Sequence, residues 1–104
     1  MIPKSIRIGG HLITIHFETG LTSYASAYGV FDPNNLKIVI DADVGESIQH
    51  ETFWHEVVEA LNFFTEAEMQ HDKIQTFGVL LHQIAKSMES QSENTEKKKR
   101  CKSC

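Results

Sequence analysis

Residues 52–64 read TFWHEVVEALNFF, and this stretch decides how the second half of the chain folds. Apolar side chains recur through it at helical spacing: Trp54, Val57, Val58, Leu61 and Phe64. Such a stripe predicts an amphipathic helix, which we expect to run from about 47 to 64 with Ser47 as its N-cap. One histidine and two glutamates lie among the apolar residues, so the helix has candidate chemical groups as well as a packing face.

A second helical stripe follows after the short polar connection TEAEMQ at 65–70. Its apolar residues recur at steps of three and four: Ile74, Phe77, Leu81, Ile84 and Met88. This spacing predicts a helix over about 72–89. Because the connection is so short, the two helices are expected to fold back on each other as a helical hairpin.

The first 41 residues have the pattern of strands. Alternating runs near 4–8 and 11–18 flank Gly9-Gly10, which is a hairpin signal. A short strand near 24–31 and a β-branched strand near 36–41 flank the turn sequence DPNN at 32–35. Strands followed by two helices predict an α+β fold, with a small, mostly antiparallel sheet of three to four strands and two packed helices.

Length and composition indicate one domain with a tail. The 104 residues suffice for a single domain, which we place at 1–90. Residues 91–104 contain no apolar residue except cysteine, so we expect a disordered basic tail. Cys101 and Cys104 in this tail form half of a zinc-binding pattern, but the chain has no second half.

Charge and hydropathy narrow the function classes. Residues 1–92 contain five Lys/Arg and twelve Asp/Glu, a net charge of −7, whereas residues 93–104 contain five Lys/Arg and two Glu, a net +3. An acidic body makes nucleic acid an unlikely partner except through the tail, and suits a site that attracts a cation. No apolar run approaches the ~18 residues of a membrane span, and the N-terminus lacks a signal-peptide core, so we expect a cytoplasmic protein.

The segment HEVVE at 55–59 is a candidate zinc site. Residues four apart lie one above the other on a helix, so His55 and Glu59 share a face. Zinc accepts imidazole nitrogen and carboxylate oxygen in tetrahedral geometry, and His71, at the start of the second helix, is the best third ligand. Glu56 points about 100° around the helix from His55, beside such an ion, where a carboxylate can take a proton from an activated water.

The alternative interpretation is an ordinary amphipathic helix with His and Glu on its wet side. Glutamate is a good helix former, so H-E-x-x-E arises by chance in many soluble helices. The flanking residues of 52–64 are unusually apolar for a solvated face. Much of this helix should therefore be buried, and buried His and Glu side chains need partners.

The segments ETFWHEVVEALN and HDKIQTFGVLLHQI together resemble small phage-encoded zincin-like proteins, which relate loosely to the ImmA/IrrE and SprT-like metallopeptidases. The resemblance implies a minimal zincin-like fold, a bound Zn²⁺ and peptidase activity. It matches His55 to the first zinc ligand, Glu56 to the catalytic base and His71 to a downstream ligand. Glu59 stands where the family has its second histidine, and a carboxylate there makes the zinc a weaker Lewis acid.

Two functions follow as expectations. The first is a zinc-dependent hydrolase, most simply a metallopeptidase, whose peptide substrate pairs with a sheet edge formed by YGVFD or LKIVID. In this case Tyr24 or Tyr28 is a candidate to stabilise an oxyanion, although packing is the commoner role of a strand tyrosine. The second is a non-catalytic phage accessory protein that docks on a protein partner through a metal-binding zincin-like scaffold.

Overall fold

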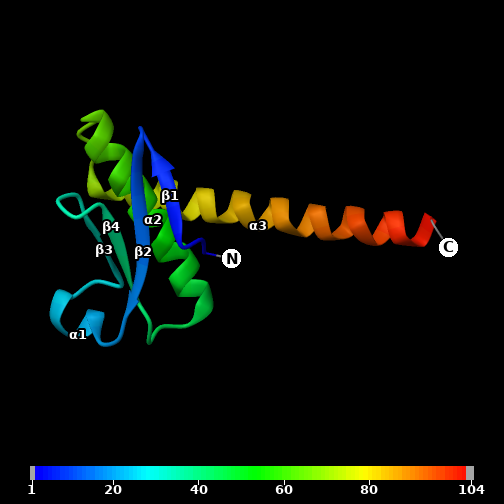
Figure 1. Ribbon diagram of the computed structural model, residues 1–104, viewed down its shortest axis with the longest axis horizontal. Coiled ribbons are helices and arrows are strands. Elements are labelled where there is room, and N and C mark those ends of the chain that lie inside the picture. The colour runs from blue at the N-terminus through cyan, green and yellow to red at the C-terminus, as the bar shows by residue number, and fades with distance from the viewer. Residues whose placement is uncertain (1, 103–104) are drawn as a thin grey trace.

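The chain builds a four-stranded mixed sheet with two long helices on one side of it (Figure 1). A computed structural model describes the backbone of residues 2–102 and the side chains of residues 2–90. The elements are β1 (Ser5–Ile8), β2 (His11–Glu18), α1 (Leu21–Ala25), β3 (Gly29–Asp32), β4 (Lys37–Asp41), α2 (Glu46–Thr65) and α3 (His71–Lys102). The predicted α+β class is confirmed.

The sheet has the strand order β1-β2-β4-β3, so β1 and β3 are its edges. β1 and β2 form the predicted hairpin, in which Gly9 and Gly10 have φ of 57° and 85° and so adopt the left-handed conformation that a tight hairpin turn requires. β3 and β4 are also antiparallel, whereas β2 and β4 run parallel. Two of the three pairings are therefore antiparallel, as expected, and the central pairing makes the sheet mixed.

The strand expected over 24–31 is wrong in its first half. Residues Leu21–Ala25 form the short helix α1, and the strand β3 occupies only Gly29–Asp32. Two contacts hold the helical turn: Leu21 is 3% exposed, and Thr22 donates both its backbone N–H and its hydroxyl to the Asp41 carboxylate. These long-range contacts outweigh the local alternation that favoured a strand.

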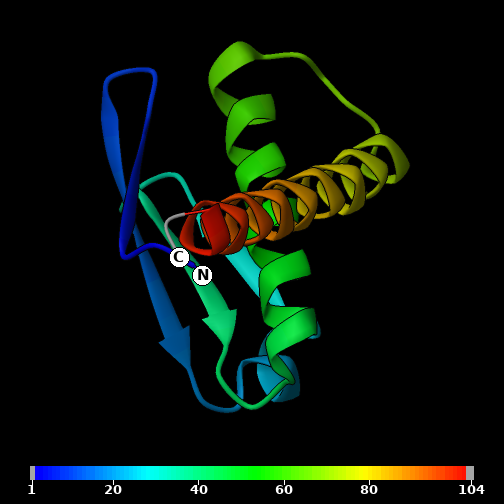
Figure 2. The same cartoon turned by 90° about the vertical axis from the view of Figure 1, so that its right-hand side faces the viewer.

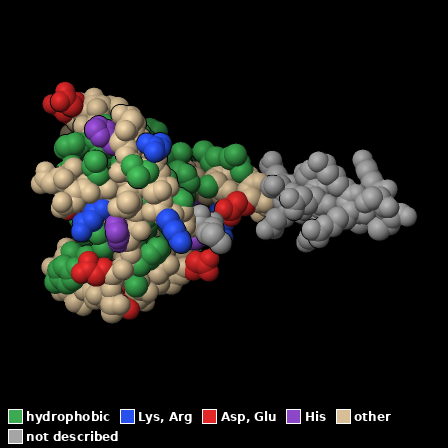
Figure 3. Space-filling view, viewed as in Figure 1, with side chains coloured by type: hydrophobic (Ala, Val, Ile, Leu, Met, Phe, Trp, Pro, Cys, Tyr) green, Lys and Arg blue, Asp and Glu red, His purple; other side chains and the backbone are tan. Residues whose placement is uncertain are grey.

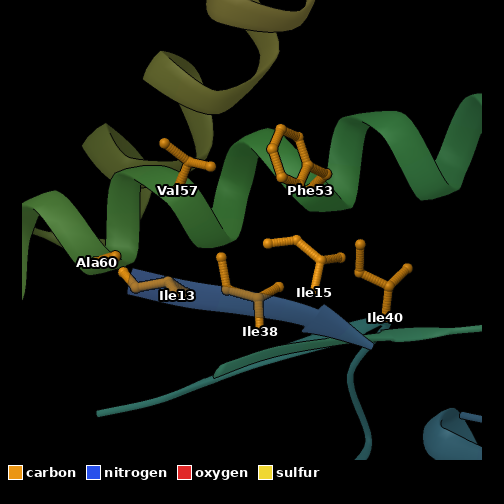
Figure 4. Packing of buried hydrophobic residues seen from close by; sticks show 7 residues of the cluster. All are labelled: Ile13, Ile15, Ile38, Ile40, Phe53, Val57 and Ala60. Carbon is orange, nitrogen blue, oxygen red and sulfur yellow. The ribbon is translucent and has the colours of Figure 1, made fainter. Parts of the chain in front are cut away.

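The core lies between α2 and the sheet (Figure 4). Its buried members are Ile13 and Ile15 from β2, Ile38 and Ile40 from β4, and Phe53, Val57 and Ala60 from α2. Of the predicted stripe, Val57 lies in this core and Trp54 and Phe64 pack against it, whereas Leu61 is 40% exposed. Phe53 and Ala60, which the stripe did not include, complete the face of α2 that contacts the sheet. The predicted cap is also wrong, because the helix begins at Glu46 with Gly45 as its N-cap.

α3 packs across α2 (Figure 2), with Ile74 buried and 4% exposed. The helix is longer than the predicted 72–89. The predicted disordered tail over 91–104 falls on residues whose side chains, and at 103–104 also the backbone, lie outside the described part, so it stays a prediction. Among the described residues, no helix has the length and apolar content to cross a membrane.

Candidate metal centre

His55, Glu59 and His71 come together at the crossing of α2 and α3. Each of the three offers one ligand atom, and these atoms all lie within 4.8 Å of one another. His55 Nε2 lies 3.7 Å from Glu59 Oε1, one helical turn along α2. The rings of His55 and His71 lie 5.5 Å apart between centroids. The structure thus gathers the three residues that the sequence proposed as ligands.

The spacing of these atoms fits a single ion after small side-chain rotations. Two ligands bound about 2.1 Å from a tetrahedral zinc ion lie about 3.4 Å apart. The His55–Glu59 distance of 3.7 Å is close to this value. His71 is exposed at the first residue of α3, so its imidazole has room to rotate inward. Two imidazoles and one carboxylate would leave the fourth position open, as catalytic zinc sites require.

Gly78 sets how closely α3 approaches the His55 end of this cluster. A Cβ at position 78 would lie 2.9 Å from Cα and 3.1 Å from N of His55, so the two helix backbones are nearly in contact there. Gly78 follows His71 by seven residues, two turns of helix, and so lies on the same face of α3. The close crossing at Gly78 therefore helps to bring His71 to His55. The sequence signal was a lone glycine inside a helical pattern, whose role as a contact point we did not predict.

Glu56, the predicted general base, is buried and lies beside the cluster. Its side chain is on α2 next to His55, and the residue is 6% exposed. Burial, followed by the charge of Glu59, raises the pKa of Glu56 to about 8, and a backbone hydrogen bond from Phe31 partly opposes that rise. The carboxyl is therefore largely protonated at neutral pH in the metal-free protein. A cation nearby would favour the ionised form.

The hydrogen bond to Glu56 comes from the free edge of β3. The Asp41 N–H donates to the Tyr28 carbonyl at 2.8 Å, and the register pairs Gly29 with Ile40. Hydrogen-bonded pairs alternate along an antiparallel ladder, so the backbone groups of Gly29 and Phe31 point away from β4. The Glu56 carboxyl thus accepts a hydrogen bond from one backbone N–H of this outer edge, that of Phe31, and so joins α2 to β3.

Gly29 is the second glycine at which two elements meet closely. A Cβ there would lie 2.4 Å from Thr52 Cγ2 and 3.2 Å from Glu56 Cγ. Thr52 is accordingly buried, with 8% of its surface exposed. The absence of a side chain at Gly29 lets α2 lie against β3, and this contact holds Glu56 at the strand edge. The sequence signal for this close approach of α2 to β3 was a glycine at the start of a strand.

A pocket of about 420 Å³ opens beside the cluster. α2 supplies Ile48, Glu51, Thr52, His55 and Glu56, the start of α3 supplies His71 and Gln75, and the segment before and within β3 supplies Ser26, Ala27, Tyr28 and Gly29. Glu59 is in the cluster but is not among the lining residues. Three of the four predicted site residues, His55, Glu56 and His71, therefore line one cavity. Tyr28 and Gly29, where the unpaired edge of β3 begins, line it too.

The two candidate tyrosines are placed differently. Tyr28 lines the pocket. Tyr24 is 66% exposed, and its hydroxyl donates to Glu18 Oε1 at 2.5 Å, so it is engaged away from the pocket. His82 lies near His50, with ring centroids 6.0 Å apart, and is not part of the cluster.

Comparisons with known proteins add no relative: no family model, no curated protein and no solved structure matches this chain.

Proposed function

We propose that this protein is a zinc-dependent hydrolase that acts on peptides, with His55, Glu59 and His71 holding the ion. The observation that carries the proposal is the convergence of these three side chains within 4.8 Å, next to a buried glutamate and an open pocket. Bound zinc supplies Lewis acidity, which polarises a carbonyl group and makes water a stronger acid. The carboxylate ligand reduces this acidity relative to a third histidine, so we expect slow turnover.

Glu56 is the proposed proton carrier. In its ionised form it accepts a proton from the attacking water and then returns it to the leaving amine, so one carboxyl serves both halves of peptide hydrolysis. Its hydrogen bond from the Phe31 backbone fixes the side chain between the strand edge and the pocket. Tyr28 is the proposed donor to the oxyanion, since it lines the same pocket and Tyr24 does not.

The substrate is proposed to add to the sheet as an extended strand beside β3. Of the two sheet-edge candidates, the segment YGVFD contains the edge strand β3, whereas LKIVID contains β4, which lies between β2 and β3. The backbone of Gly29 and the carbonyl of Phe31 remain on the outer edge for pairing. A peptide bound there would pass along the pocket that His55 and His71 line.

One observation favours the alternative of a non-catalytic protein. Glu56 ties α2 to β3 through the Phe31 backbone and carries a raised pKa, as a purely structural carboxyl would. In that case the chain is an accessory protein, for example of a phage, in which the metal and the β3 edge serve to dock a partner. Under either function we place the protein in the cytoplasm, because residues 1–100 contain no cysteine that a disulfide could use.

The deciding experiment uses Glu56→Gln beside the unchanged chain, with Cys101→Ser and Cys104→Ser in both so that the tail binds no zinc. Both proteins are expected to hold one zinc ion per chain by elemental analysis. Peptide hydrolysis should appear only in the protein that retains Glu56, and should disappear when zinc is removed with a chelator. A Glu56→Gln protein that hydrolyses peptides as fast as its parent contradicts the mechanism, and a parent without bound zinc contradicts the site.

A further inference from the structure

Glu51 is a half-buried carboxylate that lines the pocket and has no bonding partner in the described part of the chain. It lies on α2 one helical turn before His55, and both residues line the pocket. Among residues 2–90, no side chain or backbone group forms a hydrogen bond or ion pair with Glu51. A carboxylate that is partly withdrawn from water is stabilised by a cationic partner. Glu51 is therefore available to a group that enters the pocket.

Glu51 lies across the pocket from the edge of β3. β3 contacts α2 at Thr52, whose Cγ2 a Cβ on Gly29 would meet at 2.4 Å. Glu51 precedes Thr52 by one residue and so points about 100° around the helix from it, with the direction of His55 in between. The wall of the pocket on that side is α3, which contributes Gln75 to the lining. A group bound between the β3 edge and α3 therefore passes Glu51.

The charges around the pocket favour a cationic ligand. Glu51 and Glu56 are the acidic residues that line it, and no Lys or Arg from residues 2–90 is among the lining residues. Lys and Arg side chains are visible over the strands (Figure 3). The two positive charges of a zinc ion would be matched by the carboxylates of Glu59 and of ionised Glu56. Glu51 then supplies one further negative charge, which remains for the ligand.

The β3 edge directs side chains of a paired peptide toward this part of α2. Paired residues on neighbouring strands share a face of the sheet. A Cβ on Gly29 would point at Thr52 of α2, so a substrate residue paired with Gly29 points toward α2 as well. Ile48 lines the pocket three residues before Glu51, so the two side chains are neighbours on α2. An apolar wall next to a carboxylate matches a side chain with an apolar stem and a cationic head.

We propose that the pocket binds an arginine or lysine side chain of the peptide substrate, and that Glu51 selects it. This inference rests on the proposed hydrolase function and names the class of peptide on which the protein acts. Arginine fits the site in particular, because a guanidinium group donates two parallel hydrogen bonds to one carboxylate. The amide oxygen of Gln75 supplies a further acceptor in the same pocket. Glu51 binds the substrate, while proton transfer stays with Glu56.

The test uses two short peptides of alanine and threonine that differ only in a central residue, arginine or citrulline. Citrulline has nearly the shape of arginine without its charge, and both peptides are N-acetylated so that arginine is the only cation. For the zinc-loaded 104-residue chain with Cys101→Ser and Cys104→Ser, we expect kcat/KM to be about 10- to 100-fold higher with arginine. Glu51→Gln should lose most of this preference by slowing only the arginine peptide. Glu66→Gln removes the same charge at an exposed position outside the pocket and should keep the preference.

Binding separates a failure of this inference from a failure of the hydrolase proposal. Fluorescence polarisation of the same two peptides, labelled, on zinc-loaded Glu56→Gln protein requires no turnover. The arginine peptide should bind about 10- to 100-fold more tightly than the citrulline peptide, and Glu51→Gln should abolish the difference. Circular dichroism and zinc content check that each variant keeps its fold and its ion.

The outcomes differ for the two proposals. Equal hydrolysis of both peptides, or a preference that survives Glu51→Gln, overturns the selection by Glu51 and leaves the hydrolase standing. If neither peptide is cleaved, the hydrolase proposal fails and the binding result decides. A difference in affinity that Glu51→Gln removes then supports the cationic subsite, and equal affinities overturn it.

Discussion

Gly78 of α3 lies directly against His55 of α2, so closely that a Cβ at position 78 would come within 2.9 Å of the His55 Cα atom. The neighbour is backbone, which cannot move aside as a flexible side chain could. Gly78→Ala should therefore push α3 away from α2. Away from such a contact the same change would stabilise a helix by about 1 kcal/mol.

We expect Gly78→Ala to lower the free energy of unfolding by about 1–3 kcal/mol, as overpacking does, and to weaken zinc binding because His71 moves with α3. Denaturant titration and zinc titration measure the two effects. Ser87→Ala, at an exposed position of the same helix, is the control for helix propensity. An equally or more stable Gly78→Ala protein that binds zinc normally would show that the close crossing has no role.

The contact between Gly29 and Thr52 predicts a coupled pair of substitutions. Gly29→Ala alone should cost about 1–3 kcal/mol, because the new methyl group would lie 2.4 Å from Thr52 Cγ2. Thr52→Ser removes that methyl group of the threonine, so Gly29→Ala should cost less in the Thr52→Ser protein. A double-mutant cycle of unfolding free energies measures the coupling, which we expect to be about 1 kcal/mol or more. Additive effects would show that the two residues do not press on each other.

The raised pKa of Glu56 predicts how the stability of the metal-free protein depends on pH. Its pKa is about 8 in the folded state against 4.5 for the free group, so the folded state binds the proton more tightly. The contribution of Glu56 to the free energy of unfolding is therefore fully present below pH 4.5 and declines as the pH rises toward 8. In Glu56→Gln this decline should be missing, which makes the variant more stable than its parent at pH 8 by on the order of 2–4 kcal/mol.

Urea unfolding at several pH values, with a chelator present throughout, measures this difference. The amide oxygen of glutamine still accepts the hydrogen bond from Phe31, so the substitution removes the titration and keeps the contact. Identical pH dependence in the two proteins would mean that Glu56 titrates normally and is more hydrated than its burial indicates.

The proposed role of Tyr28 in the hydrolase is tested by Tyr28→Phe, with Tyr24→Phe as the matched control. Tyr28→Phe should lower kcat by about 10²-fold, the usual effect of losing a donor to an oxyanion, with little change in zinc content. Tyr24→Phe should leave kcat unchanged, since Tyr24 bonds Glu18 outside the pocket. Full activity in Tyr28→Phe would exclude the phenol from the mechanism and leave its ring as part of the pocket wall.

The sequence predicted the local elements better than their contacts. Gly9-Gly10 defined the first hairpin because left-handed φ values favour glycine, and helical periodicity placed α2 and α3. It did not predict the parallel pairing of β2 with β4, since alternation identifies a strand and not its neighbour. The helix at Leu21–Ala25 was missed for a related reason, because its stabilising bonds run to Asp41, far along the chain.

In the candidate site, too, the sequence predicted the local relationships better than the contacts between elements. Helical spacing placed His55 and Glu59 on one face, which is a local property. His71 required the assumption that a short connection folds the helices together, and the structure brings it to the cluster. Gly29 and Gly78 were missed because a glycine that permits close packing differs from other glycines only in what lies next to it.

X-ray absorption of the zinc-loaded, 104-residue chain identifies the ligands, because it reports the atoms bound to the metal. We predict a shell of nitrogen and oxygen at about 2.0–2.2 Å, with the multiple scattering of two imidazoles and no sulfur. In His71→Ala the contribution of one imidazole should be lost. A sulfur shell at about 2.3 Å would place the zinc on Cys101 and Cys104, and would contradict the assignment of His55, Glu59 and His71 as its ligands.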